Sequence, residues 1–388
     1  METAVRSLDE LMLDRETPSR AEGIAANHAV PQQDISLEEE VMQRNKDKMV
    51  AYLTENVAEF RRLSELRRKG WASTAADQFF ANQRRQADEG DRDTVIALNK
   101  MMGRIAREMH SLTRAFTIRT RGAGHPMVLD MCAAPGTYLS FALQTNPGAG
   151  AVGFSLPPEQ GGHKLVLETS ETVRIKFLDV TMLAADMGVP ISDIPPDHPH
   201  AKDFRPAEFH PGLTFDLVLC DGQVLRTHKD HRAEYRERRE ARRLTLTQLA
   251  LGLEHLRPGG TMIVLLHRFE AWDTVLLLHT FTRFSTVKTF KPRFDHAKKS
   301  SFYMVATDVQ STKAEAVAAV EGWKEDWKAA TFETDDERWR QIRPEIRANV
   351  PDVDEFLDEF GPELVRMGKK IWTIQADALE RAPFMRRR

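Results

Sequence analysis

The sequence predicts an α/β fold, in which a parallel sheet is covered by helices. Two observations lead to this prediction. Short apolar runs alternate with segments of helical periodicity through the middle of the 388-residue chain. Three of these runs end in an aspartate, namely Asp130, Asp179 and Asp221. Because the carboxyl ends of parallel strands meet at one edge of an open sheet, where ligands bind, we expect the three carboxylates to share a crevice.

Composition narrows the class of protein. A hydrophobic content of 41% is enough for a globular core, and a net charge of −3 means that any affinity for nucleic acid depends on local basic patches. The two cysteines, Cys132 and Cys220, exclude a disulfide framework and predict an intracellular location, in the cytoplasm or the nucleus. No apolar run reaches membrane-spanning length and the first residues lack a signal core, so we expect no membrane partner.

Periodicity and composition divide the chain into four parts. Residues 1–35 are polar and are expected to be disordered or loosely ordered. Residues 36–116 read as a helical region, which begins at a cap formed by Ser36. Residues 117–310 hold the sheet, and residues 311–388 form a charged helical extension. In this extension Trp323 and Trp327 are spaced as core or docking residues rather than base-stacking platforms.

The expected strands have short apolar sequences bounded by turn residues. A helix over residues 244–256 is expected to stop at Pro258-Gly259-Gly260. A proline-rich stretch, residues 188–213, reads as a long irregular insertion. Its histidines at 198, 200 and 210 follow no metal-ligand spacing, so no metal site is predicted. The strands are expected at residues 127–130, 151–156, 173–178, 215–221 and 261–266, with a closing pair at 286–292 and 300–307.

The segment Met127–Gly136, which reads MVLDMCAAPG, is the most informative part of the sequence. An apolar strand, an acid, a run of small residues and a further apolar stretch indicate a strand–turn–helix unit. Small side chains let a ligand approach the backbone, and Asp130 can accept hydrogen bonds from it. The alternative is an ordinary turn that binds no ligand.

This segment resembles the cofactor loop of the FtsJ/RrmJ-like methyltransferases, D-L-x-A-A-P-G-G, with Thr137 at the second glycine. A second stretch, VKTFKPRFDHAKKSSFYMVAT, resembles the closing hairpin of that family, K-P-x-x-S-R…S-x-E-x-Y-x-V-A. The resemblance covers about residues 116–310. It implies a Rossmann-like methyltransferase fold, with a doubly wound and mostly parallel sheet of about seven strands. It also implies S-adenosylmethionine as cofactor and methyl transfer to a ribose 2′-hydroxyl of RNA. An NAD-binding enzyme is disfavoured, because no G-x-G-x-x-G follows the first strand.

The resemblance implies roles for particular residues. The final aspartate of the family's D-L-V-x-x-D-x matches Asp221, which is catalytic in the family and here also faces the cofactor site. Lys100 is the candidate for the upstream catalytic lysine. Direct counting places Leu265 at the second lysine, whereas a longer strand end would place His267 or Arg268 there, and Arg268 is the candidate that we retain. The cofactor-binding residues implied are Asp130, Cys132, Ala133, Pro135, Gly136, Ser155, Asp179 and Asp221.

One family residue is missing. The catalytic glutamate of the family falls on Ser301. An arginine does not readily lose its proton, so Arg268 could hold a phosphate or polarise a hydroxyl but could not act as a base. A catalytically inactive methyltransferase-like protein that binds RNA or a protein partner is therefore the first alternative, and a small-molecule methyltransferase is the second.

Basic segments make RNA the expected partner. Residues 226–243 carry eight basic against four acidic side chains, and Lys288–Lys299 form a second basic stretch. Lys100, Arg104 and Arg107 share one helix face and would supply a third contact. The alternative for each is a solvated helix face with ion pairs between neighbouring turns.

Overall fold

The computed structural model describes residues 37–88, 92–119, 124–224, 234–335, 338–339 and 351–385. The predictions for residues 1–35, for the Ser36 cap and for residues 225–233 of the arginine-rich segment lie outside the described residues.

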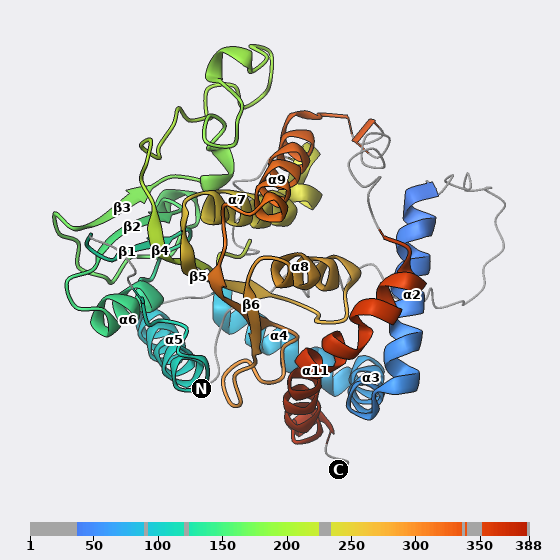
Figure 1. Cartoon of the computed structure of the whole chain (residues 1–388). Helices are drawn as coiled ribbons and strands as arrows, with labels where there is room; N and C mark the ends of the chain where they lie inside the picture. Colours follow the sequence, from blue (N-terminus) through green and yellow to red (C-terminus); the bar gives the residue numbers. More distant parts are fainter. Residues whose placement is uncertain are drawn as a thin grey trace, which may run out of the picture.

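Within the described residues, seven strands form one sheet in the order β3-β2-β1-β4-β5-β7-β6 (Figure 1). Strands β1 to β5 pair in parallel, and β7 runs antiparallel to both of its neighbours. The strand order reverses between β1 and β4, which is the switch point where open α/β sheets bind ligands. The predicted mostly parallel sheet is confirmed. The strands are β1 (Met127–Asp130), β2 (Gly150–Ser155), β3 (Val173–Phe177), β4 (Phe215–Cys220), β5 (Leu256–Leu266), β6 (Thr286–Phe290) and β7 (Phe302–Val309).

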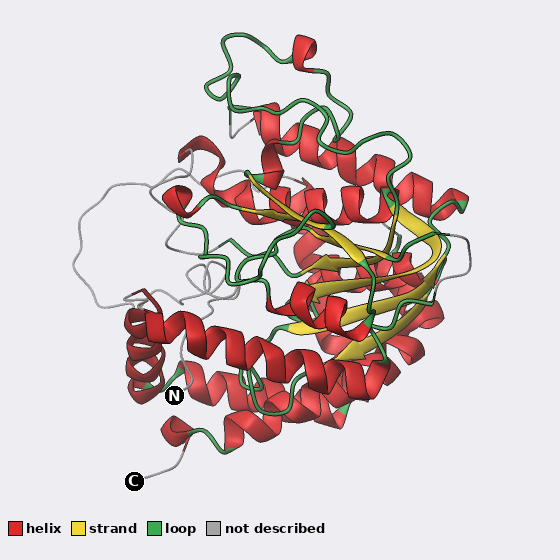
Figure 2. Ribbon diagram, turned by 90° about the vertical axis from the view of Figure 1, so that its left-hand side faces the viewer, coloured by secondary structure: helices red, strands yellow, loops and turns green. Residues whose placement is uncertain are grey.

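Helices cover both faces of the sheet, so the sheet is doubly wound (Figures 1 and 2). Neighbouring residues on β1 show this directly: Val128 belongs to one hydrophobic core and Leu129 to another. Successive side chains of a strand point to opposite faces, and each apolar side needs its own cover. Helices α5 (Arg92–Thr113) and α6 (Thr137–Thr145) pack on the Val128 face, and α7 (Glu240–Glu254), α8 (Trp272–Thr282) and α9 (Ala314–Phe332) pack on the Leu129 face.

The helical additions at the two ends of the chain pack against each other and against the sheet domain. They are α2 (Leu37–Asn56), α3 (Ala58–Trp71), α4 (Thr74–Asp88) and α11 (Val353–Glu380). An ion pair joins Arg62 of α3 to Asp377 of α11 at 2.7 Å. The ring of Trp372 on α11 lies 5.4 Å from that of Phe60 and 5.3 Å from that of Phe269. No helix among the described residues has the length and apolar character needed to cross a bilayer.

Several predicted boundaries shift. The first predicted helix divides at Val57 into α2 and α3. Helix α7 ends at Glu254, and the following Pro-Gly-Gly turn is part of β5, with an irregular register between Gly260 and Met262. Trp327 is buried, as predicted, and its Nε1 donates to the Thr181 carbonyl at 3.2 Å.

The short 3-10 helices are η1 (Pro158–Gln160), η2 (Val180–Met182), η3 (Ile191–Asp193), η5 (Glu234–Arg239) and η6 (Pro383–Met385).

Candidate active site

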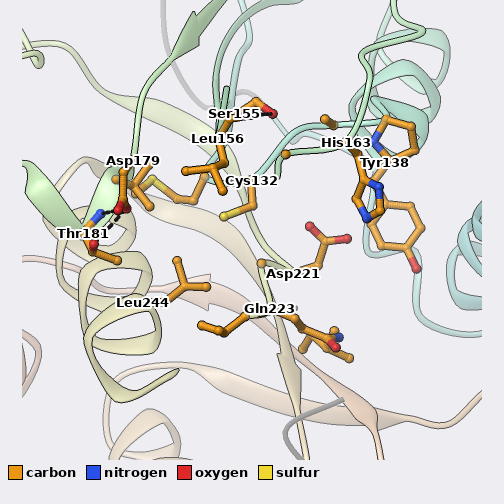
Figure 3. A pocket seen from close by; sticks show the side chains of 18 of the residues that line it. Cys132, Tyr138, Ser155, Leu156, His163, Asp179, Thr181, Asp221, Gln223 and Leu244 are labelled. Carbon is orange, nitrogen blue, oxygen red and sulfur yellow. Dashed lines mark hydrogen bonds between the residues drawn. The ribbon is translucent and has the colours of Figure 1, made fainter. Parts of the chain in front are cut away.

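A cavity of about 200 Å³ opens at the carboxyl ends of the central strands. It lies at the switch point of the sheet, and the Asp221 side chain projects into it (Figure 3). The lining side chains come from the ends of β1 to β5, from α5, α6, η2, η5, α7 and β7, and from the segment that joins β6 to β7. Residues far apart in sequence therefore meet at one site, which two of the three aspartates at the strand ends, Asp179 and Asp221, line.

The turn between β1 and α6 forms one wall of this cavity. Gly136 has a left-handed φ of 102°, and a Cβ on it would lie only 2.5 Å from the Leu167 Cβ, so only glycine suits this position. A second close approach occurs at Gly222, where a Cβ would lie 2.2 Å from the Cys132 Sγ. The two turns, after β1 and after β4, thus approach each other as closely as their side chains permit.

The structure brings five of the eight predicted cofactor-binding residues to the cavity: Cys132, Pro135, Ser155, Asp179 and Asp221. The other three do not line it. Asp130 is buried behind the turn, where its Oδ1 accepts a hydrogen bond from the Cys132 amide at 3.1 Å. Ala133 packs against β2, and its amide donates to the Phe154 carbonyl at 2.7 Å. Gly136 faces a separate hollow beside Arg107. These three residues shape the turn.

The acids of the site are poorly solvated. Burial raises the pKa of Asp221 from 3.8 to about 7. Burial and the neighbouring Asp221 carboxylate raise the pKa of Asp130 well above its usual range. A cavity with acids in this condition favours a positively charged ligand, because the positive charge offsets the cost of ionising a buried carboxyl group.

Asp179 occupies the opposite end of the cavity from Tyr138 (Figure 3). Its Oδ1 accepts hydrogen bonds from the amide and the hydroxyl group of Thr181, at 2.9 and 2.8 Å. This is the N-cap role that the sequence also allowed, and it is compatible with a ligand contact because Asp179 lines the cavity.

The two predicted lysine and arginine catalysts do not reach the cavity. Lys100 is exposed on α5, whereas Leu98, Met101 and Ile105 turn inward and line the site, as helical periodicity requires. Arg268 has a left-handed φ of 47°, and its Nε lies 3.9 Å from Glu270. Leu265, the residue that direct counting matches to the second family lysine, does line the cavity.

In the described part of the arginine-rich segment, residues 234–243, most arginines are structural, which corrects the expectation that these residues contact RNA. Arg243 is wholly buried; it pairs with Glu240 at 2.9 Å and donates to the Thr181 carbonyl at 2.9 Å. Arg236 and Arg239 are also buried, and Arg242 forms an ion pair with Asp326. Lys100, Arg104 and Arg107 were the third expected RNA contact. Within this group, Arg104 forms an ion pair with Asp295 at 2.6 Å.

Other lining residues were missed by sequence reasoning. The hydroxyl groups of Tyr138 and Tyr303 lie 2.6 Å apart, and burial raises the pKa of both. His163, which follows β2 and is labelled in Figure 3, and His296, which follows β6, also line the cavity. Sequence order alone offered little signal for these, apart from Tyr303 and His296 falling within the hairpin that resembles the family.

Comparisons with known proteins agree with this geometry. The open, mostly parallel sheet with acids gathered at its switch point defines a Rossmann-like α/β fold. Residues 102–309, more than half of the chain, match the family of FtsJ-like methyltransferases. The chain belongs to this family. Its cofactor is accordingly S-adenosylmethionine, and the chain is an S-adenosylmethionine-dependent methyltransferase.

Two solved structures with distant likeness to this chain are both of methyltransferases or methylases. Human methyltransferase-like protein 13 in complex with SAH has 11% identity and a TM-score of 0.32, over 57% of this chain and 92% of that chain. An rRNA methylase from Streptococcus thermophilus has 12% identity and a TM-score of 0.27, over 48% of this chain and 88% of that chain. The curated proteins contain no match to this chain. The family match therefore carries the assignment.

Proposed function

We propose that this chain transfers a methyl group from S-adenosylmethionine to a ribose 2′-hydroxyl of RNA. The observation that carries the proposal is Asp221, which directly follows β4, projects into the cavity and matches the family's catalytic aspartate. An RNA substrate is consistent with a location inside the cell, in the cytoplasm or the nucleus.

The residues present fit the cofactor. Its bound form supplies an electrophilic methyl group on a positively charged sulfur. The acids of the cavity favour such a charge, and the close turns at Cys132 and Gly222 leave backbone accessible to a ligand. We assign the holding of the cofactor to the turn Cys132–Pro135 and to Ser155, Asp179 and Asp221. Asp130 supports that turn from behind through its hydrogen bond to Cys132.

RNA contacts are assigned to the segment between β6 and β7. Phe294 is 79% exposed there, and the adjacent Arg293 side chain is 54% exposed. An exposed aromatic ring beside a cation suits stacking on a nucleobase and contact with a phosphate. The same segment places His296 in the cavity, so an RNA held by Phe294 and Arg293 would lie close to the reacting centre.

A non-catalytic RNA-binding or protein-binding role is the second candidate. The observation that favours it is the loss of two family catalysts: Leu265 lines the cavity in place of a lysine, and Ser301 is buried in place of a glutamate. Methyl transfer to a small molecule is a third candidate. Exposed basic segments would favour RNA over a small molecule, but most of the described arginines in residues 234–243 are buried.

The test is a methyl-transfer assay on RNA from cells that lack the protein, followed by nuclease digestion and mass spectrometry of the nucleosides. Wild type should produce 2′-O-methyl nucleosides, and Asp221→Asn should lower the rate about a hundredfold or more at saturating cofactor. Asp197→Asn, at an exposed site outside the cavity, is the matched control. Cofactor binding by wild type without any transfer would favour the binding role, and methylation of a base would contradict the ribose assignment.

A further inference from the structure

His296 lines the cavity, as do Tyr303 and Leu265, the residue that direct counting matches to the family's second lysine. Leu265 on β5 and Tyr303 on β7 are direct partners in the antiparallel ladder, so they present neighbouring side chains. An apolar leucine cannot take a proton, so a proton acceptor must be sought among the other groups that line the cavity.

The backbone around His296 is held firmly. The Lys291 Nζ is buried and donates to the carbonyl oxygens of His296 at 2.9 Å and Ser301 at 2.7 Å, and also to that of Lys299. The Lys299 amide donates to the His296 carbonyl at 3.0 Å. His296 itself has a left-handed φ of 58°, an unusual conformation for a residue with a side chain. Such strain is retained where the surrounding structure enforces it, and it is concentrated at functional sites.

Most other polar groups that line the cavity are engaged or keep their protons. The Asp179 carboxylate caps η2, and the Glu240 carboxylate pairs with Arg243 and Arg236. Burial raises the pKa values of the Cys132 thiol and of the two tyrosine hydroxyl groups, so these remain protonated at neutral pH. The groups that remain to accept a proton are Asp221, His163 and His296.

We propose that His296 is the proton acceptor of the methyl transfer, acting on a substrate hydroxyl group held at the Leu265–Tyr303 end of the cavity. This inference rests on the proposed function. His296 takes the hydroxyl proton on an imidazole nitrogen while the substrate oxygen bonds the methyl carbon and the carbon–sulfur bond breaks. The proton then passes to solvent, so the sum of the reaction is a methyl ether, a neutral thioether and one released proton.

The surroundings keep the imidazole ready for this role. Burial, Lys299, Lys291 and His267 lower the pKa of His296 well below 6.5, so the ring is unprotonated at neutral pH. In the part of the chain that the structure describes, the ring makes no hydrogen bond that would occupy its nitrogens. Asp221, which follows β4, and Tyr303 of β7 also line the cavity, and an ionised Asp221 would offset the charge of the imidazolium that forms.

The test is chemical rescue in the full-length protein. Glycine accepts a left-handed φ, so His296→Gly removes the imidazole without adding strain. We expect its single-turnover methylation rate to fall about a hundredfold or more, and added imidazole to restore part of that rate. Affinities for SAH and for RNA should stay within about twofold of wild type. His125→Gln, an exposed histidine just before β1 and away from the cavity, should match wild type.

Three results would overturn the proposal. These are an unchanged rate in His296→Gly, a lost rate that imidazole does not restore, and a rescue pattern that appears in His163→Gly instead. If wild type methylates no RNA, the proposed function fails, and NMR titration of the imidazole signals then tests His296 separately. Its signals, assigned by their absence from His296→Gly, should shift on addition of SAH and report a pKa below 6.5. His296 signals that do not shift when SAH is added would contradict the position of His296 in the cavity.

Discussion

Asp221 combines two properties that are costly together, namely burial and a position where negative charge is needed. Burial raises its pKa to about 7, so at neutral pH the carboxyl group is only partly ionised. The cofactor carries a positive sulfur, and a positive charge nearby favours the ionised form. Binding of the cofactor should therefore release a proton from Asp221.

This linkage predicts that affinity for S-adenosylmethionine rises by about tenfold between pH 6 and pH 8, because the ionised fraction of a group with a pKa of 7 rises by that factor. Burial lowers the pKa values of the two cavity histidines, so His163 and His296 contribute little to this window. Calorimetric titration across the range measures the effect.

Two comparisons control this measurement. Asp221→Asn should bind with an affinity that barely changes with pH, and SAH, whose sulfur is neutral, should show a smaller slope with wild type. Equal slopes in wild type and Asp221→Asn would show that another group titrates.

At the scale of elements, arginines of η5 and α7 are buried and hold neighbouring elements together. Arg243 inserts from α7 between Glu240 and the carbonyl of Thr181, and its Nε donates to the Thr331 hydroxyl of α9 at 2.9 Å. One guanidinium therefore joins α7 to η2, which caps one end of the cavity, and to α9. The fork of five donors suits this task better than a lysine ammonium would.

Arg243→Met should lower the free energy of unfolding by about 3–5 kcal/mol, because it leaves the Glu240 carboxylate buried without its main partner. Urea unfolding followed by circular dichroism measures the loss. Arg238→Met, an exposed arginine in the same segment, should change stability by less than about 0.5 kcal/mol. Arg243→Met that keeps wild-type stability but loses RNA affinity would restore the interpretation of this segment as a phosphate contact.

At the scale of the whole molecule, the terminal helices share a core with the sheet domain. The same apolar cluster contains Phe60 of α3, Trp372 of α11, and Met304 of β7. Gln375 of α11 also donates to the carbonyl of Lys298, in the segment that places His296 in the cavity. We therefore expect the helical additions and the sheet domain to unfold together.

Trp372→Ala should destabilise the protein by about 3–5 kcal/mol, because the side chain is fully buried between Phe60 and Phe269. Thermal unfolding should remain a single transition at a lower temperature. Trp71→Ala, which removes a side chain that is 59% exposed, is the matched control and should have little effect. A separate early transition in Trp372→Ala would show that the additions form an independent unit.

The sequence by itself determined the sheet and the location of the site. Buried parallel strands leave short apolar runs in the sequence, and the residue that ends each run must lie at the ligand-binding edge. Asp179 and Asp221 therefore line one cavity, and Asp130 lies directly behind it. The small-residue turn after β1 also carried its own signal, because glycine is required where φ is positive and the backbone is crowded.

Only the tertiary structure decided which charged groups reach the site. Lys100 was adjacent in sequence to inward-facing residues, yet the rotation of α5 places it in solvent. Arg236, Arg239 and Arg243 were expected at the surface, yet the packing of η5 and α7 against residues distant in sequence buries them. His296 enters the cavity because a buried lysine folds its loop. These outcomes depend on contacts between residues far apart in the chain, and the local sequence pattern does not specify such contacts.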